Sequence, residues 1–120
     1  MPWLERTELL IGSENVEILQ NANVLVVGVG GVGAYAAEMI ARAGVGKMTL
    51  ADADTVSESN INRQLNALHS TSGREKCAVL AERLRDLLIN APSCYSFRMI
   101  KNLTSFSIYK GSMIALLCYR

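Results

Sequence analysis

The chain has 120 residues, half of them hydrophobic, so it can bury one modest core, and this length favours one domain over two. Its net charge of +1 indicates no class of partner, but all eleven acidic residues lie within residues 1–86 and none follows. The three cysteines are odd in number and form no C-x-x-C pair, which argues against a zinc knuckle or a disulfide framework and fits a reducing cytosol.

The first predicted elements are a short helix and a buried strand. Ser13 is suited to cap a helix that runs to Gln20, with Val16 and Leu19 on one face. A run of valine and leucine then predicts a strand over residues 24–29. Because this run does not alternate with polar residues, we expect the strand to be buried on both faces of a parallel sheet.

A glycine-rich turn, Gly-Val-Gly-Gly-Val-Gly at residues 28–33, is the strongest signal in the sequence. Gly28 permits a tight turn, Gly30 lets the backbone approach a phosphate, and Gly33 allows close packing of helix on strand. Since the first amides of a helix attract anions, this strand, turn and helix together predict a nucleotide-binding site.

A helix over residues 32–43 and a second strand over residues 47–52 complete a βαβ unit. We expect small and apolar residues of the helix to face the sheet, namely Ala36, Ala37, Ile40 and Ala43, with Gly44 and Gly46 ending the helix. The fold class predicted is α/β, a Rossmann-like three-layer fold with a mainly parallel sheet. Asp52, about 20 residues after the turn, is placed to accept hydrogen bonds from ribose hydroxyls.

Residues 55–72 are polar and are expected to form an irregular rim that carries chemistry. A cluster of polar residues follows the second strand: Asp54, Asn60, Asn62, Arg63, Gln64 and Lys76. A triphosphate needs cations such as Arg63 and Lys76, because about four negative charges must be neutralised before a nucleophile reaches phosphorus. A dinucleotide dehydrogenase needs no such cluster. His69, the only histidine, has no partner in the sequence that would make it a base.

A long helix is predicted over residues 74–90, ended by Pro92. Cys77 lies on its apolar face and is expected in the core rather than as a nucleophile. Residues 1–92 are assigned to one Rossmann-like ATP-binding domain, and residues 93–120 are left unassigned. Within that tail, residues 105–109 and 113–117 have the composition of strands.

Six motifs in register over residues 5–90 resemble the ThiF/MoeB/HesA family of ATP-dependent adenylating enzymes, which are related to ubiquitin-activating enzymes. They are Arg6, the glycine turn, residues 43–46 (AGVG), residues 52–56 (DADTV), residues 60–64 (NINRQ) and residues 73–76 (GREK). The NINRQL run, then residues 67–70 (ALHS) and 81–83 (AER), most resemble the branch of tRNA threonylcarbamoyladenosine dehydratases.

The resemblance implies roles for individual residues and two cofactors, ATP and Mg²⁺. The glycine loop (Gly28, Gly30, Gly31, Gly33) would hold the nucleotide, Asp52 the ribose, and Asn60, Arg63 and Lys76 the phosphates. Asp54 is a candidate for steering magnesium, Gln64 could order the rim, and no further metal ligand is assigned. Arg6 would reach the ATP site of a neighbouring subunit, which requires a homodimer. Arg6, Arg63 and Lys76 are therefore the catalytic candidates.

The implied reaction is the adenylation of a substrate carboxylate. In the dehydratase branch this carboxylate belongs to the threonylcarbamoyl group of tRNA, which then closes into a ring with loss of water. The alternatives are adenylation of a ubiquitin-like sulfur carrier for thiamin or molybdopterin synthesis, an NAD-binding module, or a non-catalytic nucleotide-binding module. The tail cations Arg98, Lys101, Lys110 and Arg120 could touch RNA but are more typical of a solvated surface.

The tail departs from the family pattern. The family continues with a strand that ends in a magnesium-binding aspartate, whereas residues 93–120 contain no carboxylate. The chain is then either a truncated or frame-shifted family member, which the loss of every acidic residue favours, or a divergent short one, and we expect it to lack full adenylating activity. An uncovered sheet edge and helix face would favour a dimer. With no leader and no apolar run long enough to cross a bilayer, the sequence predicts a soluble, cytoplasmic protein.

Overall fold

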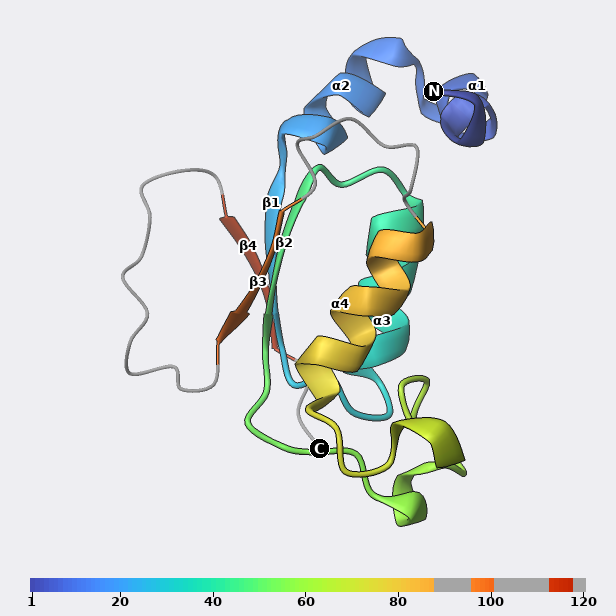
Figure 1. The fold of residues 1–120 in the computed structure, drawn as a ribbon. Coiled ribbons are helices and arrows are strands. Elements are labelled where there is room, and N and C mark those ends of the chain that lie inside the picture. Colours follow the sequence, from blue (N-terminus) through green and yellow to red (C-terminus); the bar gives the residue numbers. More distant parts are fainter. Residues whose placement is uncertain (88–95, 101–112, 118–120) are drawn as a thin grey trace.

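The computed structural model of the chain describes residues 1–87, together with the backbone of residues 96–100 and 113–117. The strands form one parallel sheet in the order β3-β2-β1-β4. Their bounds are β1 Asn23–Val27, β2 Lys47–Ala51, β3 Ser96–Ile100 and β4 Met113–Leu117. Helices α3 and α4 lie together on one face of this sheet (Figure 1). The predicted α/β class with a parallel sheet is confirmed.

Strand β1 is the centre of the sheet because its residues are apolar on both faces. Val24, Leu25 and Val26 are all buried, with exposed fractions of 4%, 6% and 0%. The strand pairs in parallel with β2 on one side and with β4 on the other. The predicted strand is therefore confirmed, although it ends at Val27 and leaves Gly28 free to turn.

Helix α3 (Gly33–Arg42) packs on the sheet through its alanines. The fully buried residues are Ala34, Ala37 and Ala41, which follow the helical spacing of three and four residues. The helix face that packs on the sheet differs from the predicted one, because the predicted residues Ala36 and Ala43 are only half-buried. Small side chains along this line let the helix axis approach β1 closely.

Helix α4 (Lys76–Leu87) lies beside α3. Its buried residues include Cys77, Leu80, Ala81 and Leu84, as the apolar spacing predicts. The predicted helix began two residues earlier, whereas its last three residues, 88–90, lie outside the described residues. Figure 1 shows that α3 and α4 cover the same face of the sheet. Both helices begin near the carboxyl ends of the strands.

Two helices precede the sheet at the amino end of its strands (Figure 1). After a short 3₁₀ turn, η1 (Pro2–Leu4), come α1 (Glu5–Ile11) and α2 (Ser13–Asn21). The predicted Ser13 cap is wrong, because Gly12 ends α1 and also takes the capping position of α2, with φ of +87°. Gly12 alone separates the two helices, so Ser13 becomes the first residue of α2 rather than its cap.

The rim between β2 and α4 is irregular, as predicted, and lies at the carboxyl end of the strands. It contains two 3₁₀ turns, η2 (Glu58–Asn60) and η3 (His69–Thr71). Both ends of the rim are joined, since the Val56 amide donates to the Arg74 carbonyl at 2.8 Å. The rim is therefore a loop whose two ends are hydrogen-bonded to each other at the carboxyl end of the sheet.

Two strands come from beyond residue 92. The prediction of a strand over residues 113–117 is confirmed by β4, while residues 105–109 lie outside the described residues. Strand β3 was not predicted from the sequence. Both strands join the sheet of β1 and β2, whereas the division of the chain at residue 92 stays a prediction. No helix in the described ranges is long and apolar enough to span a membrane.

Candidate nucleotide-binding site

A cavity of about 330 Å³ lies beyond the carboxyl end of β1, between the glycine loop and the rim. This is where open α/β sheets bind ligands, and the volume lies at the lower end of the usual range for small-molecule sites. Its lining residues are Gly30, Gly31, Val32, Asn60, Arg63, Gln64 and Lys76. Six of these seven were predicted from the sequence, and Val32 is the addition.

The glycine loop turns away from β1 in a backbone conformation that suits glycine. Gly28 has φ of +85°, and its amide donates to the Ala51 carbonyl at 2.8 Å. A Cβ at Gly30 would lie 3.5 Å from Nε2 of Gln64, and one at Gly31 would lie 3.7 Å from the Arg63 carbonyl. Side chains at these two positions would therefore enter the space between loop and rim. Gly33, also predicted, is the buried first residue of α3.

Asp52 holds the loop in place from the end of β2. Its Oδ2 accepts a hydrogen bond from the Val29 amide at 2.9 Å, and its Oδ1 accepts one from the Asp54 amide at 2.8 Å. The carboxylate therefore has an observed structural role that the sequence did not predict. Each carboxylate oxygen can accept a second hydrogen bond, so the predicted contact with ribose stays chemically possible.

Lys76 is the buried cation of the site. It is the first residue of α4, is 3% exposed and lines the cavity. Its Nζ lies 3.7 Å from Oδ2 of Asp54, and its backbone amide donates to the Asp54 carbonyl at 3.1 Å. Since a lysine is rarely buried without a partner, the Asp54 carboxylate explains how this ammonium group is kept beside the cavity.

Asn60 is the last residue of η2, and Arg63 lies in the turn that follows it. The Asn60 side chain accepts a hydrogen bond from the Ser57 amide at 3.0 Å, which closes the turn. Arg63 is exposed, and its Nη1 donates to the Ser59 carbonyl at 3.0 Å and to Oδ1 of Asn62 at 2.9 Å. Both bonds use one nitrogen of the guanidinium group. The rim thus places a second cation opposite the glycine loop.

Gln64 and Asn66 are buried amides on the inner side of the rim. Gln64 lines the cavity at 8% exposure, and its Oε1 accepts no hydrogen bond from the part of the chain that the structure describes. Asn66 is 1% exposed and donates from Nδ2 to the Val29 carbonyl at 3.0 Å. Asn66 was not predicted as a site residue, because nothing in a polar run shows which asparagine turns inward.

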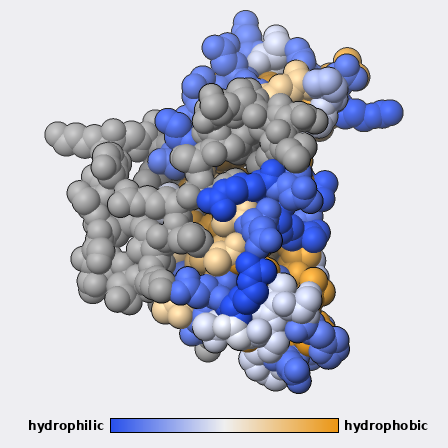
Figure 2. Space-filling view, in the orientation of Figure 1, coloured by the Kyte–Doolittle hydropathy of each residue, from blue (hydrophilic) through white to orange (hydrophobic). Residues whose placement is uncertain are grey.

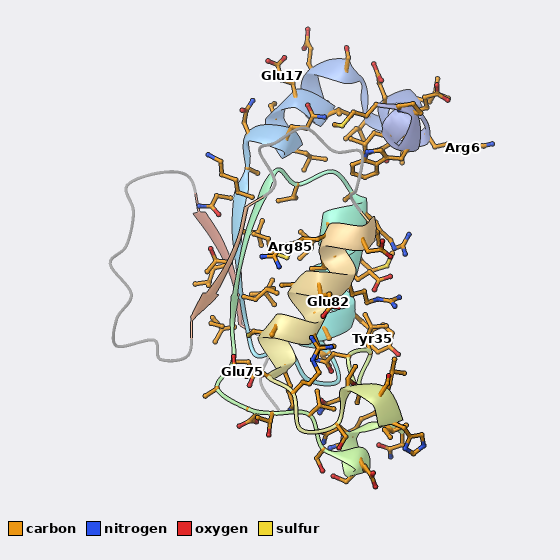
Figure 3. All side chains as sticks on the ribbon, viewed as in Figure 1. Arg6, Glu17, Tyr35, Glu75, Glu82 and Arg85 are labelled. Carbon is orange, nitrogen blue, oxygen red and sulfur yellow. The ribbon has the colours of Figure 1, made fainter. Side chains whose placement is uncertain are left out.

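Three other residues lie apart from the cavity. Arg6 is exposed on α1, and Figure 3 places it at the opposite end of the molecule from Glu75, the neighbour of Lys76. His69 is exposed on η3 and does not line the cavity. Cys77 is 3% exposed, and burial raises the pKa of its thiol to about 12, as expected of a core cysteine. The tail cations lie where no side chain is described.

Among the residues that the structure describes, no three histidine, cysteine or carboxylate side chains gather to hold a metal ion. The charged groups at the cavity are instead two cations, Arg63 and Lys76, and one carboxylate, Asp54. Such a site is suited to a polyphosphate that brings most of its own oxygen ligands for a cation.

The parallel sheet, the glycine turn and the cavity beside it define a Rossmann-like α/β domain. Residues 4–116 match the ThiF family, and the chain belongs to this family.

Relatives carry more specific names. The chain is 51% identical over 82 residues to a tRNA threonylcarbamoyladenosine dehydratase of Bacillus subtilis. This alignment covers 68% of this chain and 32% of the relative. It is also 48% identical over 75 residues to a molybdopterin-synthase adenylyltransferase of Salmonella typhimurium. That alignment covers 62% of this chain and 28% of the relative. The chain therefore spans about a third of the length of these curated relatives.

A solved structure has the same fold. It is the tRNA N6-threonylcarbamoyladenosine dehydratase of Escherichia coli, TcdA, in complex with ATP. The TM-score is 0.77 at 38% sequence identity, over 84% of this chain and 40% of that chain. The family match over residues 4–116 includes the glycine loop and the rim.

Proposed function

We propose that this chain supplies the ATP-binding part of an enzyme that adenylates a substrate carboxylate. The observation that carries the proposal is one cavity in which Gly30 and Gly31 face Arg63 and Lys76. Loop amides and two cations together suit a polyphosphate, and Asn60 completes the set assigned to the phosphates. The ATP complex of the related TcdA supports the choice of ATP.

In the proposed reaction a carboxylate oxygen attacks the α-phosphorus of ATP. A bond forms between them, the bond from the α-phosphorus to the oxygen of the β-phosphate breaks, and pyrophosphate leaves from an acyl-adenylate. Arg63 and Lys76 would stabilise the negative charge that moves onto pyrophosphate. Lys76 is buried, so its interaction with this charge is weakened less by water than that of an exposed cation.

Mg²⁺ is the second proposed cofactor, and the described residues fit it. Magnesium ions in such sites take one or two carboxylates together with phosphate oxygens. Asp54, beside Lys76, supplies the carboxylate, and Mg²⁺ would neutralise phosphate charge there. Asp52 is proposed to bind the ribose through the free lone pairs of the two oxygens that hold the Val29 and Asp54 amides.

The proposed substrate is the threonylcarbamoyl group of a modified adenosine in tRNA, which would close into a ring with loss of water after activation. The 51% identity to the Bacillus dehydratase favours this choice. The cytoplasm is the proposed location, because tRNA is there. Since the chain spans about a third of that relative, we expect ATP binding but not full turnover from these residues alone.

The second candidate is the adenylation of a ubiquitin-like sulfur carrier, favoured by the 48% identity to the Salmonella adenylyltransferase. This candidate requires a protein partner with an accessible C-terminal carboxylate. ATP–pyrophosphate exchange that depends on such a carrier, and not on modified tRNA, would favour it. An NAD-binding module would leave the positions of Arg63 and Lys76 at the cavity unexplained.

A homodimer is part of the proposal, because Arg6 lies far from the cavity of its own chain. Several large apolar side chains are exposed: Leu9, Leu10, Ile18, Val32, Tyr35, Met39 and Leu68. In Figure 2 apolar atoms lie on this face of the molecule in separate patches among polar side chains. A second copy that covered this surface would remove it from water and could bring its own Arg6 to the cavity.

A thermal-shift measurement on the whole chain tests the proposal with three samples: Mg-ATP, NAD and no ligand. A ligand at 100 times its dissociation constant stabilises the folded state by about 2.7 kcal/mol, so the melting temperature should rise clearly with Mg-ATP. A rise with NAD alone would show that the cavity serves a dinucleotide and that the proposal is wrong.

The variant Arg63→Glu sharpens this test, because it reverses a charge at the cavity without removing a buried group. We expect it to abolish the shift with Mg-ATP. Lys47→Glu is the matched control, since Lys47 is an exposed cation at the amino end of β2. The control should keep the full shift, and equal loss in both variants would mean that net charge alone accounts for binding.

A further inference from the structure

The peptide groups on either side of Val29 are held by side chains from two distant segments. The Val29 amide donates to Oδ2 of Asp52, and the Val29 carbonyl accepts from Nδ2 of Asn66 at 3.0 Å. The side chain of Val29 is also fully buried, at 0% exposure. The first residues of the glycine loop are therefore fixed by the protein itself, before any ligand binds.

The hydrogen bond from Asn66 fixes more than one carbonyl. A trans peptide is planar, so its N–H points opposite to its C=O, and the described residues contain no cis peptide. By holding the Val29 carbonyl, Asn66 sets the direction of the Gly30 amide. Gly30 lines the cavity, and within the described part of the chain its amide donates to no protein group.

Asn66 is itself anchored in a way that favours a role for its donor. Its backbone carbonyl accepts a hydrogen bond from Oγ1 of Thr71 at 2.7 Å, which ties it to η3. Its Oδ1 is buried and has no partner among the described residues. An unpaired buried acceptor destabilises a fold, and an apolar residue of similar shape would avoid this cost. The position is thus better explained by what Nδ2 does to the loop than by stability.

We propose that Asn66 is a positioning residue that aims the Gly30 amide at a phosphate of the bound nucleotide. The inference rests on the proposed function, since it assumes that the cavity holds a polyphosphate. It assigns to Asn66 an effect on phosphate binding alone, because the side chain is covered by the rim and reaches the ligand only through the Val29–Gly30 peptide.

Calorimetric titration of the whole chain with Mg-ATP and with adenosine tests this role in the variant Asn66→Leu, which has a similar shape and no donor. We expect affinity for Mg-ATP to fall about tenfold, because a hydrogen bond to a charged group is worth roughly that factor. Affinity for adenosine should not change, since adenosine has no phosphate. Thr49→Val, which also removes a buried polar group but lies in β2, should leave both affinities at the wild-type values.

The outcomes separate the inference from the function on which it rests. If the wild-type chain binds no Mg-ATP, both are overturned. Suppose that the wild-type chain binds Mg-ATP. If the ratio of ATP affinity to adenosine affinity is then the same in Asn66→Leu as in the wild-type chain, only the role of Asn66 is overturned. An equal loss of both affinities would show a structural role and overturn it as well.

A measurement on the wild-type chain keeps the test decisive if Asn66→Leu does not fold. In a ¹⁵N-labelled sample, addition of Mg-ATP should move the Gly30 amide proton downfield, whereas adenosine should leave it in place, because only a phosphate accepts its hydrogen bond. Thr71→Val should reduce the shift, since it removes the anchor of Asn66. A Gly30 amide that does not respond to Mg-ATP would overturn the inference.

Discussion

Gly46 and Gly31 are both glycines, but the space around them gives them different roles. A Cβ at Gly46 would lie 1.7 Å from the Gln20 carbonyl oxygen, whereas the nearest atom to a Cβ at Gly31 would be 3.7 Å away. The Gly46 amide also donates to the Leu19 carbonyl at 3.1 Å. Gly46 therefore lets the end of α2 approach the start of β2, while Gly31 leaves open the space beside Arg63.

We expect Gly46→Ala to lower the free energy of unfolding by more than about 3 kcal/mol, because backbone atoms must move apart to admit the methyl group. Gly31→Ala should change stability by less than about 1 kcal/mol, since its methyl group meets only ordinary contacts. Urea unfolding of both variants measures this difference. Equal midpoints for the two variants would contradict it.

Cys77 is expected to be chemically unreactive in the folded protein. Burial raises the pKa of its thiol to about 12, and the nearby Asp52 charge acts in the same direction. Since only the thiolate reacts with iodoacetamide, Cys77 should stay unmodified at neutral pH until the chain is unfolded in urea. Mass spectrometry of the Cys77 peptide measures this. Rapid modification in the folded state would mean that the residue is accessible.

Residues marked by their own chemistry could be predicted from the sequence as neighbours of the cavity. The glycine loop is followed directly by its helix, and Arg63 and Lys76 are marked by their charge, so all of these were found. Asn66 and Glu38 were not, because their partners lie 37 and 45 residues away along the chain. The second role of Asp52, as an acceptor for the Val29 amide, also needs the distance between two strand ends, which a sequence does not contain.

At the scale of elements, Glu38 connects α3, which follows the glycine loop, with α4, whose first residue Lys76 lines the cavity. It lies on α3 at 7% exposure and accepts two hydrogen bonds from Arg83 of α4, at 2.6 and 3.2 Å. Arg42 adds two more from the next turn of α3. The start of α3 follows the glycine loop and the start of α4 carries Lys76, so this ion pair helps fix the distance between them.

The pKa of Glu38 is held below its ordinary value of 4.5, chiefly by the hydrogen bonds from Arg83, which outweigh the effect of burial. Arg83 is correspondingly stabilised as a cation, and its pKa is raised. Because the folded pKa of the carboxyl is lowered, its contribution to stability is complete above the unfolded value of 4.5 and is lost as the pH falls through the folded value.

We therefore expect Glu38→Gln to lower the free energy of unfolding at pH 7 by about 1 to 2 kcal/mol, a modest value because Arg83 is half exposed. The difference from wild type should narrow below about pH 4.5 and vanish in stronger acid. Glu82→Gln, which breaks an exposed pair with Arg74, should cost less than about 0.5 kcal/mol. Chemical denaturation across pH measures both, and a difference that does not depend on pH would contradict the ion-pair explanation.

Elements with a strong local pattern were predicted well, and those that depend on their neighbours were not. The unbroken valine and leucine run gave β1, and the apolar spacing gave α3 and α4 within two residues at each described end. Strand β3 has no comparable pattern, because Ser96–Ile100 contains an arginine and gains its strand conformation by pairing with β2. The buried face of α3 was predicted incorrectly because alanines occur on several sides of the helix, and only packing determines which of them face the sheet.

For the whole molecule, the main consequence of the fold is that Arg6 and the cavity lie at opposite ends. Figure 1 shows α1 at the amino end of the strands and the rim at the carboxyl end. Leu9 and Leu10, on the same helix as Arg6, are 86% and 84% exposed. Two adjacent leucines this exposed on one helix are typical of a surface that another protein covers. A second copy of the chain would supply both the cover for these leucines and an arginine for the cavity.

Mixing two inactive variants tests whether Arg6 acts across a dimer. Arg6→Ala should weaken Mg-ATP binding in both sites of its dimer, and Arg63→Glu should do the same by removing a cavity cation. In a mixed dimer, one site has Arg63 from its own chain and Arg6 from the partner, so that site is intact. Random mixing in equal amounts should therefore restore about a quarter of the wild-type sites, as measured by calorimetric stoichiometry.

The control for mixing is Arg63→Glu with Lys76→Ala, because Arg63 and Lys76 line the same cavity of one chain. Every site in that mixture lacks one of the two cations, so no binding should return. Light scattering at micromolar concentration should give twice the mass of one chain for each sample. A monomer, or a mixture of Arg6→Ala and Arg63→Glu that regains no sites, would mean that Arg6 has no role in the cavity, since on its own chain it lies too far away to reach the nucleotide.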